Sequence, residues 1–154
     1  MTTGTSRGGG WVVGQFIIMA LILAAGFSPV GRYDTPAGLP YIGWLLVAVG
    51  LYVAWRGFAD LGKNLTPFPK PLDGAGLVTT GIYAIVRHPI YSSALLLFLG
   101  TAVLQSNAIA IGLTGVLAVW FEFKSRREEV FLRATFPAYA AYMTRVKKFV
   151  PFVY

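Results

Sequence analysis

Long apolar stretches separated by polar segments set the pattern of this chain. Two of them, 11–30 and 39–58, are long enough to cross a bilayer, which takes about 20 apolar residues in a helix. Two shorter apolar stretches follow at 89–105 and 108–123, and the tight connection between them predicts an antiparallel helical hairpin. We therefore expect an all-α polytopic membrane protein with about four transmembrane helices, of which the last two form the short hairpin.

The residues after the fourth apolar stretch combine charge with helical periodicity. Oppositely charged side chains four residues apart indicate that the helix of 108–123 continues out of the membrane. Pro137 interrupts this helix and can begin a second one. We therefore predict cytoplasmic amphipathic helices at this end of the chain. The second helix would have an apolar face and a basic last turn, formed by Tyr139, Tyr142, Met143, Val146, Lys147 and Lys148.

The connection 61–80 is longer and more polar than the others. Three prolines within 67–71 exclude a regular helix there. Irregular backbone cannot face lipid, so this segment must lie in water or fold over the ends of the helices. Long irregular loops are often binding loops, so the segment is either a lid over a site or a stiff linker.

Composition supports the assignment to a membrane. The 154-residue chain is 56% hydrophobic and 12% charged, about half the charged fraction of soluble domains. The Gly-rich residues 1–10 are predicted to be disordered. Residues 11–154 are predicted to form one domain, with the first apolar stretch kept as a helix because no clear cleavage site of a signal peptide follows it.

The net charge of +7 arises from Lys and Arg that lie between and after the apolar stretches. The loop after the second stretch and the segment after the fourth are rich in these cations, whereas the loop after the first has Arg32 alone and the hairpin tip has none. By the positive-inside rule, both termini and the loop 61–80 face the cytoplasm. These cations suit anionic lipid headgroups, and we expect no nucleic-acid partner.

Residue types exclude several kinds of chemistry. The chain has no cysteine and one histidine, which excludes disulfides, thiolate metal sites, cysteine nucleophiles and His-rich metal centres. We expect no metal. The glycines at 74–76 precede no alternation of strand and helix, so the chain lacks the glycine-rich fingerprint of soluble nucleotide-binding domains.

The candidate chemistry lies where the loop meets the third apolar stretch. The one histidine, His88, stands beside Arg87 there. Glu128 and Glu129 follow the fourth stretch, and the hairpin brings the two positions together on the cytoplasmic side. Two cationic or donor groups, two carboxylates and aromatic neighbours suit a zwitterionic ligand with an aromatic part, its carboxylate held by arginine and its ammonium by glutamate.

Each of these residues also has a structural interpretation. Arg87 can extend its charge to the membrane interface. His88 can cap the helix that Pro89 begins, and Glu128 and Glu129 can belong to a solvated ladder of charges. Spacing alone does not choose between these interpretations and a ligand site.

Three segments carry a more specific pattern: GIYAIVRHPIY at 81–91, RREEVFL at 126–132, and FPAYAAYMTRV at 136–146 followed by Pro151. Together they resemble the catalytic half of the isoprenylcysteine carboxyl methyltransferases. They are similar also to the related phospholipid N-methyltransferases and membrane thiol methyltransferases. The resemblance covers 64–154, and it implies a compact, prokaryotic-type member in the inner or plasma membrane with a cytoplasmic active site.

The resemblance implies S-adenosyl-L-methionine as methyl donor, S-adenosyl-L-homocysteine as product, and a lipophilic acceptor such as an isoprenylcysteine-like carboxylate. It makes Arg87, His88 and Lys124 the catalytic candidates. Lys124 occupies the position where carboxyl-methylating members have an arginine that holds the substrate carboxylate, and lysine lacks the bidentate fork of arginine. By matching motif positions, the cofactor shell comprises Gly76, Leu77, Val78, Tyr83, Arg87, His88, Pro89, Tyr91, Glu128 and Glu129.

Several alternatives stay open. An amine or thiol acceptor must lose a proton, and His88 is the only base suited to neutral pH, whereas a carboxylate acceptor needs no base. We expect His88 to bind the cofactor. Alternatives to a carboxyl methyltransferase are a phospholipid amine or thiol methyltransferase of the same family, a non-catalytic module that binds a lipid or a partner, and a reductase of the sterol-reductase type.

Overall fold

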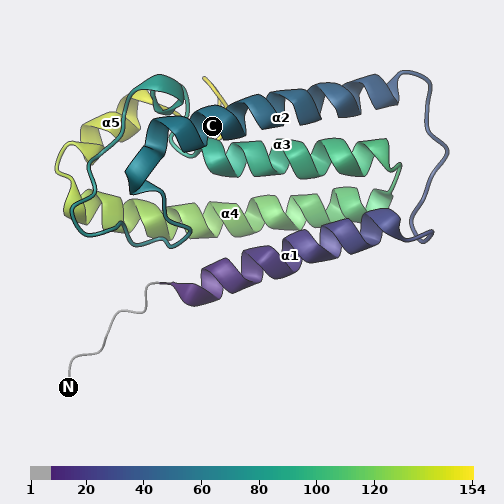
Figure 1. Ribbon diagram of the computed structural model, residues 1–154, viewed down its shortest axis with the longest axis horizontal. Helices are drawn as coiled ribbons and strands as arrows, with labels where there is room; N and C mark the ends of the chain where they lie inside the picture. Colours follow the sequence, from purple (N-terminus) through teal and green to yellow (C-terminus); the bar gives the residue numbers. More distant parts are fainter. Residues whose placement is uncertain (1–7) are drawn as a thin grey trace.

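Four long helices run lengthwise through the computed structural model, which describes residues 8–154 (Figure 1). In chain order the elements are α1 (Gly9–Phe27), α2 (Leu39–Leu61), the 3₁₀ helices η1 (Gly62–Asn64) and η2 (Gly81–Ala84), α3 (Pro89–Leu104), α4 (Ala108–Thr135) and α5 (Tyr139–Arg145). Within the described part, β-structure is limited to two isolated bridges. The predicted all-α class is confirmed.

The apolar helices are those expected of a polytopic membrane protein. Helices α1, α2 and α4 are each long and apolar enough to cross a membrane, and α3 is a shorter apolar helix of 16 residues. The predicted membrane fold is therefore confirmed, whereas the exact number of spans stays a prediction. Figure 1 shows the order α2, α3, α4, α1 across the bundle, with α2 packed along α3 and α1 along α4.

The predicted hairpin is formed by α3 and α4, and Asn107 fixes its tip. The Asn107 side chain is fully buried and accepts a hydrogen bond from the Ala110 N–H (3.0 Å), which caps α4. Its amide nitrogen donates to the carbonyl oxygens of Ala25 (2.8 Å) and Val30 (2.9 Å) at the end of α1. One polar side chain thus joins the start of α4 to the end of α1 and the residues that follow it.

Glycines allow α2 and α3 to approach closely. Gly43, Gly50 and Gly57 are buried and recur every seven residues along the face of α2 that meets α3. On α3, a Cβ at Gly100 would lie 2.8 Å from the carbonyl oxygen of Gly43. Since that oxygen belongs to helix backbone, it cannot turn away as a side chain can.

We expect Gly100→Ala to lower stability by about 1–3 kcal/mol, because the added methyl group must push α2 and α3 apart. The measurement is thermal unfolding of the detergent-solubilised protein. Gly112→Ala is the matched control, since a Cβ at Gly112 meets nothing within 4 Å. Equal unfolding temperatures for the two variants would contradict the predicted close contact.

The bounds of the first two helices differ from the sequence-based ones by up to three residues. Residues 1–10 are predicted to be disordered, but Gly9 and Gly10 belong to α1, and residues 1–7 lie outside the described part. The first helix ends at Phe27, and α2 extends three residues beyond the expected end, to Leu61. Glycine does not by itself end a helix, and apolar neighbours continue the helical packing.

Helix α4 confirms the prediction that the fourth apolar helix continues beyond the hydrophobic stretch. It runs unbroken for 28 residues and ends at Thr135, two residues before Pro137. Helix α5 is shorter than predicted, because it ends at Arg145. The expectation that Lys147 and Lys148 close its last turn is therefore wrong.

Lys147 and Lys148 instead join the segment before α3. The backbone N–H of Arg87 donates to the Lys147 carbonyl (2.8 Å), and that of His88 donates to the Lys148 carbonyl (3.0 Å). Tyr83, Arg87 and Tyr91 are spaced four residues apart, as on one face of a helix, but no helix runs through them, since α3 begins only at Pro89. Proline disfavours helical backbone in the residue before it, which leaves the two N–H groups available to the later segment.

Candidate active site

A cavity of about 350 Å³ lies between the bundle and the loop that follows α2. Its walls come from α1, α2, α3, α4 and α5, and the loop contributes residues 64–69, 71 and 75–78. The loop therefore forms one wall of a cavity, as the lid interpretation of 61–80 expects. Figure 1 shows this loop folded back toward α4 and α5 at one end of the bundle.

Most of the predicted site residues meet around this cavity. They come from the loop, η2, the start of α3 and the second half of α4, which are far apart in the sequence. Of the predicted set, only Glu129 is not part of the wall, and it supports two residues that are. Binding of a cofactor by these residues stays a prediction. The predicted residues that line the cavity are Gly76, Leu77, Val78, Tyr83, Arg87, His88, Pro89, Tyr91, Lys124 and Glu128.

Glu129 holds Arg87 and His88 from behind the cavity wall. Its Oε1 accepts hydrogen bonds from Arg87 Nε (3.1 Å) and His88 Nε2 (3.0 Å), and it lies 3.0 Å from Arg87 Nη2. The side chains of all three are at least nine-tenths buried. A buried carboxylate with a guanidinium and a ring N–H as partners avoids the cost of an isolated charge.

The remaining contacts of Arg87 favour a positioning role. Its Nη1 donates to the backbone carbonyl oxygens of Met143 and Val146, at the end of α5. Glu129 and these two carbonyls occupy most of the five N–H donors of the guanidinium. Arg87 thus ties α4 to the C-terminal end of α5, which favours a positioning role over the direct ligand contact expected from sequence.

Glu128 faces the cavity beside two stacked rings. Tyr91 donates its hydroxyl hydrogen to Glu128 Oε2 (2.7 Å), and the rings of His88 and Tyr91 stack with an interplanar angle of 9°. His88 Nδ1 lies 3.9 Å from the same carboxylate oxygen. Since Glu129 accepts from Nε2, the neutral imidazole leaves Nδ1 as its acceptor nitrogen. A carboxylate beside aromatic faces suits a cationic group of a ligand.

Lys124 places a buried cation at the inner end of the cavity. Its residue is 1% exposed, and its ammonium donates to Gln15 Oε1 of α1 and lies 5.2 Å from the centre of the Tyr91 ring. Gln15 was not a predicted site residue. The available signal was that it is the one polar side chain in the core of the first apolar stretch, residues 12–27, and polar groups in such stretches mark functional positions.

We expect Gln15→Leu to lower stability by about 1.5–3 kcal/mol, because it removes the hydrogen-bond acceptor of a buried ammonium. The double variant Gln15→Leu/Lys124→Met should recover most of that stability, since it removes the buried charge as well. Thermal unfolding of the three proteins is the measurement. A double variant no more stable than Gln15→Leu would show that the ammonium is not the cause.

Three tyrosines from η2 and α5 complete the outer end of the cavity. Tyr83 donates to the Gly57 carbonyl (3.3 Å), and Tyr142 donates to the Tyr83 carbonyl. Burial raises the pKa of Tyr142 to about 12 and raises the pKa values of Tyr83 and Tyr139 further. All three phenols are therefore neutral near pH 7 and can donate hydrogen bonds.

The comparisons with known proteins agree with this arrangement. The family model described as phospholipid methyltransferase matches residues 39–139, from α2 to the start of α5. Among solved structures, a eukaryotic intramembrane Ras methyltransferase, isoprenylcysteine carboxyl methyltransferase, superposes with a TM-score of 0.69 at 27% sequence identity. The alignment covers 90% of this chain and 52% of that one, so the chain spans about half the length of the structure it matches.

A search of curated proteins finds no significant match. The family assignment therefore rests on the family model and the solved structure, which agree with each other and with the motifs at 81–91 and 126–132. The family model covers well over half of the chain, and the matched residues include most of the cavity wall. By its sequence and its membrane-helical fold, the chain belongs to the phospholipid methyltransferase family.

Proposed function

We propose that this integral membrane protein transfers a methyl group from S-adenosyl-L-methionine to a lipophilic acceptor. The observation that carries the proposal is the cavity between the membrane helices and the loop, which has the Glu128 carboxylate and the His88 and Tyr91 rings in its wall. Family membership supplies the reaction class, and the cavity supplies a place where a polar donor and an apolar acceptor can meet.

The residues present fit this methyl donor. The cavity volume of about 350 Å³ lies in the range of small-molecule sites. Glu128 would take the cationic amino group, and the aromatic walls would take the adenine ring. When bound, S-adenosyl-L-methionine would supply an electrophilic methyl group on a sulfonium centre. Gly76, Leu77 and Val78 would close the loop side and keep water from the reacting atoms.

The acceptor end lies deeper in the bundle. Around Lys124 the cavity is lined by Phe16 and Met19 of α1, Ala94 of α3 and Phe121 of α4, all of them apolar. An apolar acceptor can reach this end from the bilayer, while the cation suits an anionic group on it. We therefore favour an acceptor with a carboxylate, such as an isoprenylcysteine-like compound, over an amine or a thiol.

His88 has a different task for each class of acceptor. A carboxylate acceptor needs no base, so the imidazole then binds the cofactor and stacks on Tyr91, whose hydroxyl holds Glu128. For an amine or a thiol, Nδ1 of His88 is the nitrogen able to receive the proton, because Nε2 donates to Glu129. Arg87 and Glu129 hold the ring in place in both cases.

The charge pattern supports a cytoplasmic site. Residues 56–87 and the chain from Lys124 onward carry eleven of the thirteen Lys and Arg, and the positive-inside rule puts these two regions on the cytoplasmic face. Both termini are expected on that side, and the membrane would be the inner or plasma membrane of a prokaryote.

The test is calorimetric binding of S-adenosylhomocysteine to the protein in lipid nanodiscs, followed by transfer of labelled methyl groups to extracted membrane lipids. Saturable binding and labelled lipid are expected. A carboxyl methyl ester releases volatile methanol in mild base, whereas a methylated amine or thioether does not, so the same product identifies the acceptor class. Absence of binding would favour a non-catalytic lipid-binding or partner-binding module, and binding of NADPH instead would favour a reductase.

A further inference from the structure

Tyr139 has a buried hydroxyl group without a partner. The residue is 2% exposed, begins α5 and lines the cavity. Among the buried side-chain nitrogen and oxygen atoms of residues 8–154, its hydroxyl oxygen alone has no hydrogen-bond partner in the protein. Such a group costs folding free energy, and in native proteins it calls for a specific explanation.

An aromatic contact holds the ring of Tyr139. Its ring packs edge-on against the Tyr142 ring, with centroids 5.6 Å apart. Tyr142 is held in turn by its hydrogen bond to the Tyr83 carbonyl. Burial raises the pKa of Tyr139, so the phenol keeps its hydrogen and can donate to a ligand as well as accept.

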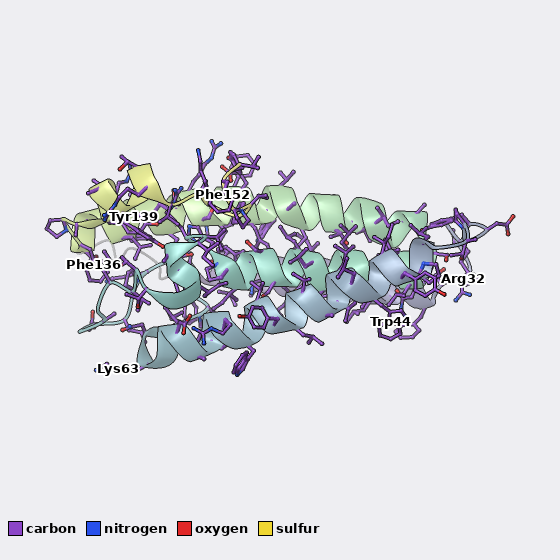
Figure 2. The ribbon with its side chains drawn as sticks, turned by 90° about the horizontal axis from the view of Figure 1, so that it is seen from above. Arg32, Trp44, Lys63, Phe136, Tyr139 and Phe152 are labelled. Carbon is purple, nitrogen blue, oxygen red and sulfur yellow. The ribbon has the colours of Figure 1, made fainter. Side chains whose placement is uncertain are left out.

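The position along the cavity indicates which part of a ligand the hydroxyl meets. The wall near Tyr139 includes Phe136, the residue directly after the end of α4. Phe136 is twelve residues beyond Lys124, which corresponds to roughly 18 Å along the helix axis. Figure 2 shows Tyr139 and Phe136 at the same end of the molecule, opposite Arg32 and Trp44. Tyr139 therefore lies at the outer end of the cavity, far from the acceptor cation.

The residue types in the rest of the cavity wall indicate which part of the methyl donor lies where. Glu128 lies between Lys124 and Phe136 along α4 and suits the ammonium group of the methyl donor. The outer end has aromatic and apolar walls, which suit a nucleoside. We propose that the Tyr139 hydroxyl hydrogen-bonds a polar atom of the nucleoside half of the methyl donor, an inference that rests on the proposed function.

Tyr139→Phe tests this proposal because it removes only the oxygen. The ligand-free variant should unfold at the wild-type temperature or above it, since an unpaired buried hydroxyl is lost. Its affinity for S-adenosylhomocysteine should fall on the order of fivefold to tenfold, the usual effect of one hydrogen bond. Tyr142→Phe should show the opposite stability effect, a lower unfolding temperature, because its hydroxyl is bonded to the Tyr83 carbonyl. Tyr41→Phe, at a residue 80% exposed, is the control for binding.

A second ligand identifies which half of the methyl donor the Tyr139 hydroxyl contacts. 5′-Deoxy-5′-methylthioadenosine has the nucleoside but lacks the amino acid, so its affinity for Tyr139→Phe should fall by the same factor. Wild-type affinity of Tyr139→Phe for both ligands would overturn the proposal, as would a loss confined to S-adenosylhomocysteine. Failure of the wild-type protein to bind either ligand would instead overturn the proposed function.

Discussion

Glu129→Ala is expected to lower stability by about 3–5 kcal/mol, enough to unfold much of the protein at physiological temperature. The Glu129 side chain is 6% exposed and compensates the Arg87 guanidinium, which is 9% exposed. Removing the carboxylate leaves a buried cation and also removes the acceptor of the His88 ring N–H. The measurement is thermal unfolding of the detergent-solubilised protein, with the folded yield as a second readout.

A double variant that removes the charges of both Arg87 and Glu129 tests whether the loss of stability comes from an uncompensated buried charge. Arg87→Met/Glu129→Leu should be more stable than Glu129→Ala, because no charge is left uncompensated, although the two carbonyl contacts of Arg87 are lost. Arg126→Ala is the control for an exposed ion pair and should leave the unfolding temperature unchanged. A fall in unfolding temperature after Arg126→Ala as large as that after Glu129→Ala would contradict the role assigned to burial.

Much of the site could be predicted because its residues follow from local rules and one short connection. Proline at 89 begins α3, and the tight turn before Asn107 sends the chain back along the same axis. These two features bring Glu128 to His88 and Tyr91, although nearly 40 residues separate them in the sequence. Charged and aromatic residue types at those positions then indicate a ligand site.

Some contacts could not be predicted, because they join segments far apart in the sequence and no local sequence pattern indicates that these segments meet. The backbone pairing of Arg87 and His88 with Lys147 and Lys148 forms only because α5 stops early and turns the chain back toward α3. The sequence shows two basic residues there, which fit a helix end equally well.

Gln15 and Tyr139 show a related limit on prediction. A lone glutamine in an apolar helix signals a polar contact but not its partner, and Lys124 is 109 residues away. Tyr139 belongs to an apolar face in the sequence, so its pattern predicts burial and says nothing of its hydroxyl. The unpaired oxygen becomes visible only when every neighbour has been placed.

Glu128→Gln is expected to lower the affinity for S-adenosylhomocysteine by on the order of 10-fold to 100-fold, while the folded yield stays at the wild-type level. The carboxylate lines the cavity and would pair with the ligand ammonium, and hydrogen bonds to charged groups contribute about 1.5–3 kcal/mol. Folding should be spared because the Glu128 side chain is 26% exposed and glutamine can still accept from Tyr91. Calorimetry in nanodiscs measures the affinity, and circular dichroism confirms the fold.

The same variant identifies which cation Glu128 faces. S-adenosylmethionine has a sulfonium and an ammonium, whereas S-adenosylhomocysteine keeps only the ammonium. An equal loss for both ligands places the carboxylate at the ammonium, and a larger loss for S-adenosylmethionine places it near the sulfonium. Tyr91→Phe is the matched control, because it removes the hydroxyl bonded to Glu128 but keeps the charge and the ring that stacks on His88. If Tyr91→Phe loses as much affinity as Glu128→Gln, the Tyr91 hydroxyl rather than the Glu128 charge recognises the ligand. The role of Glu128 is then to orient the Tyr91 hydroxyl.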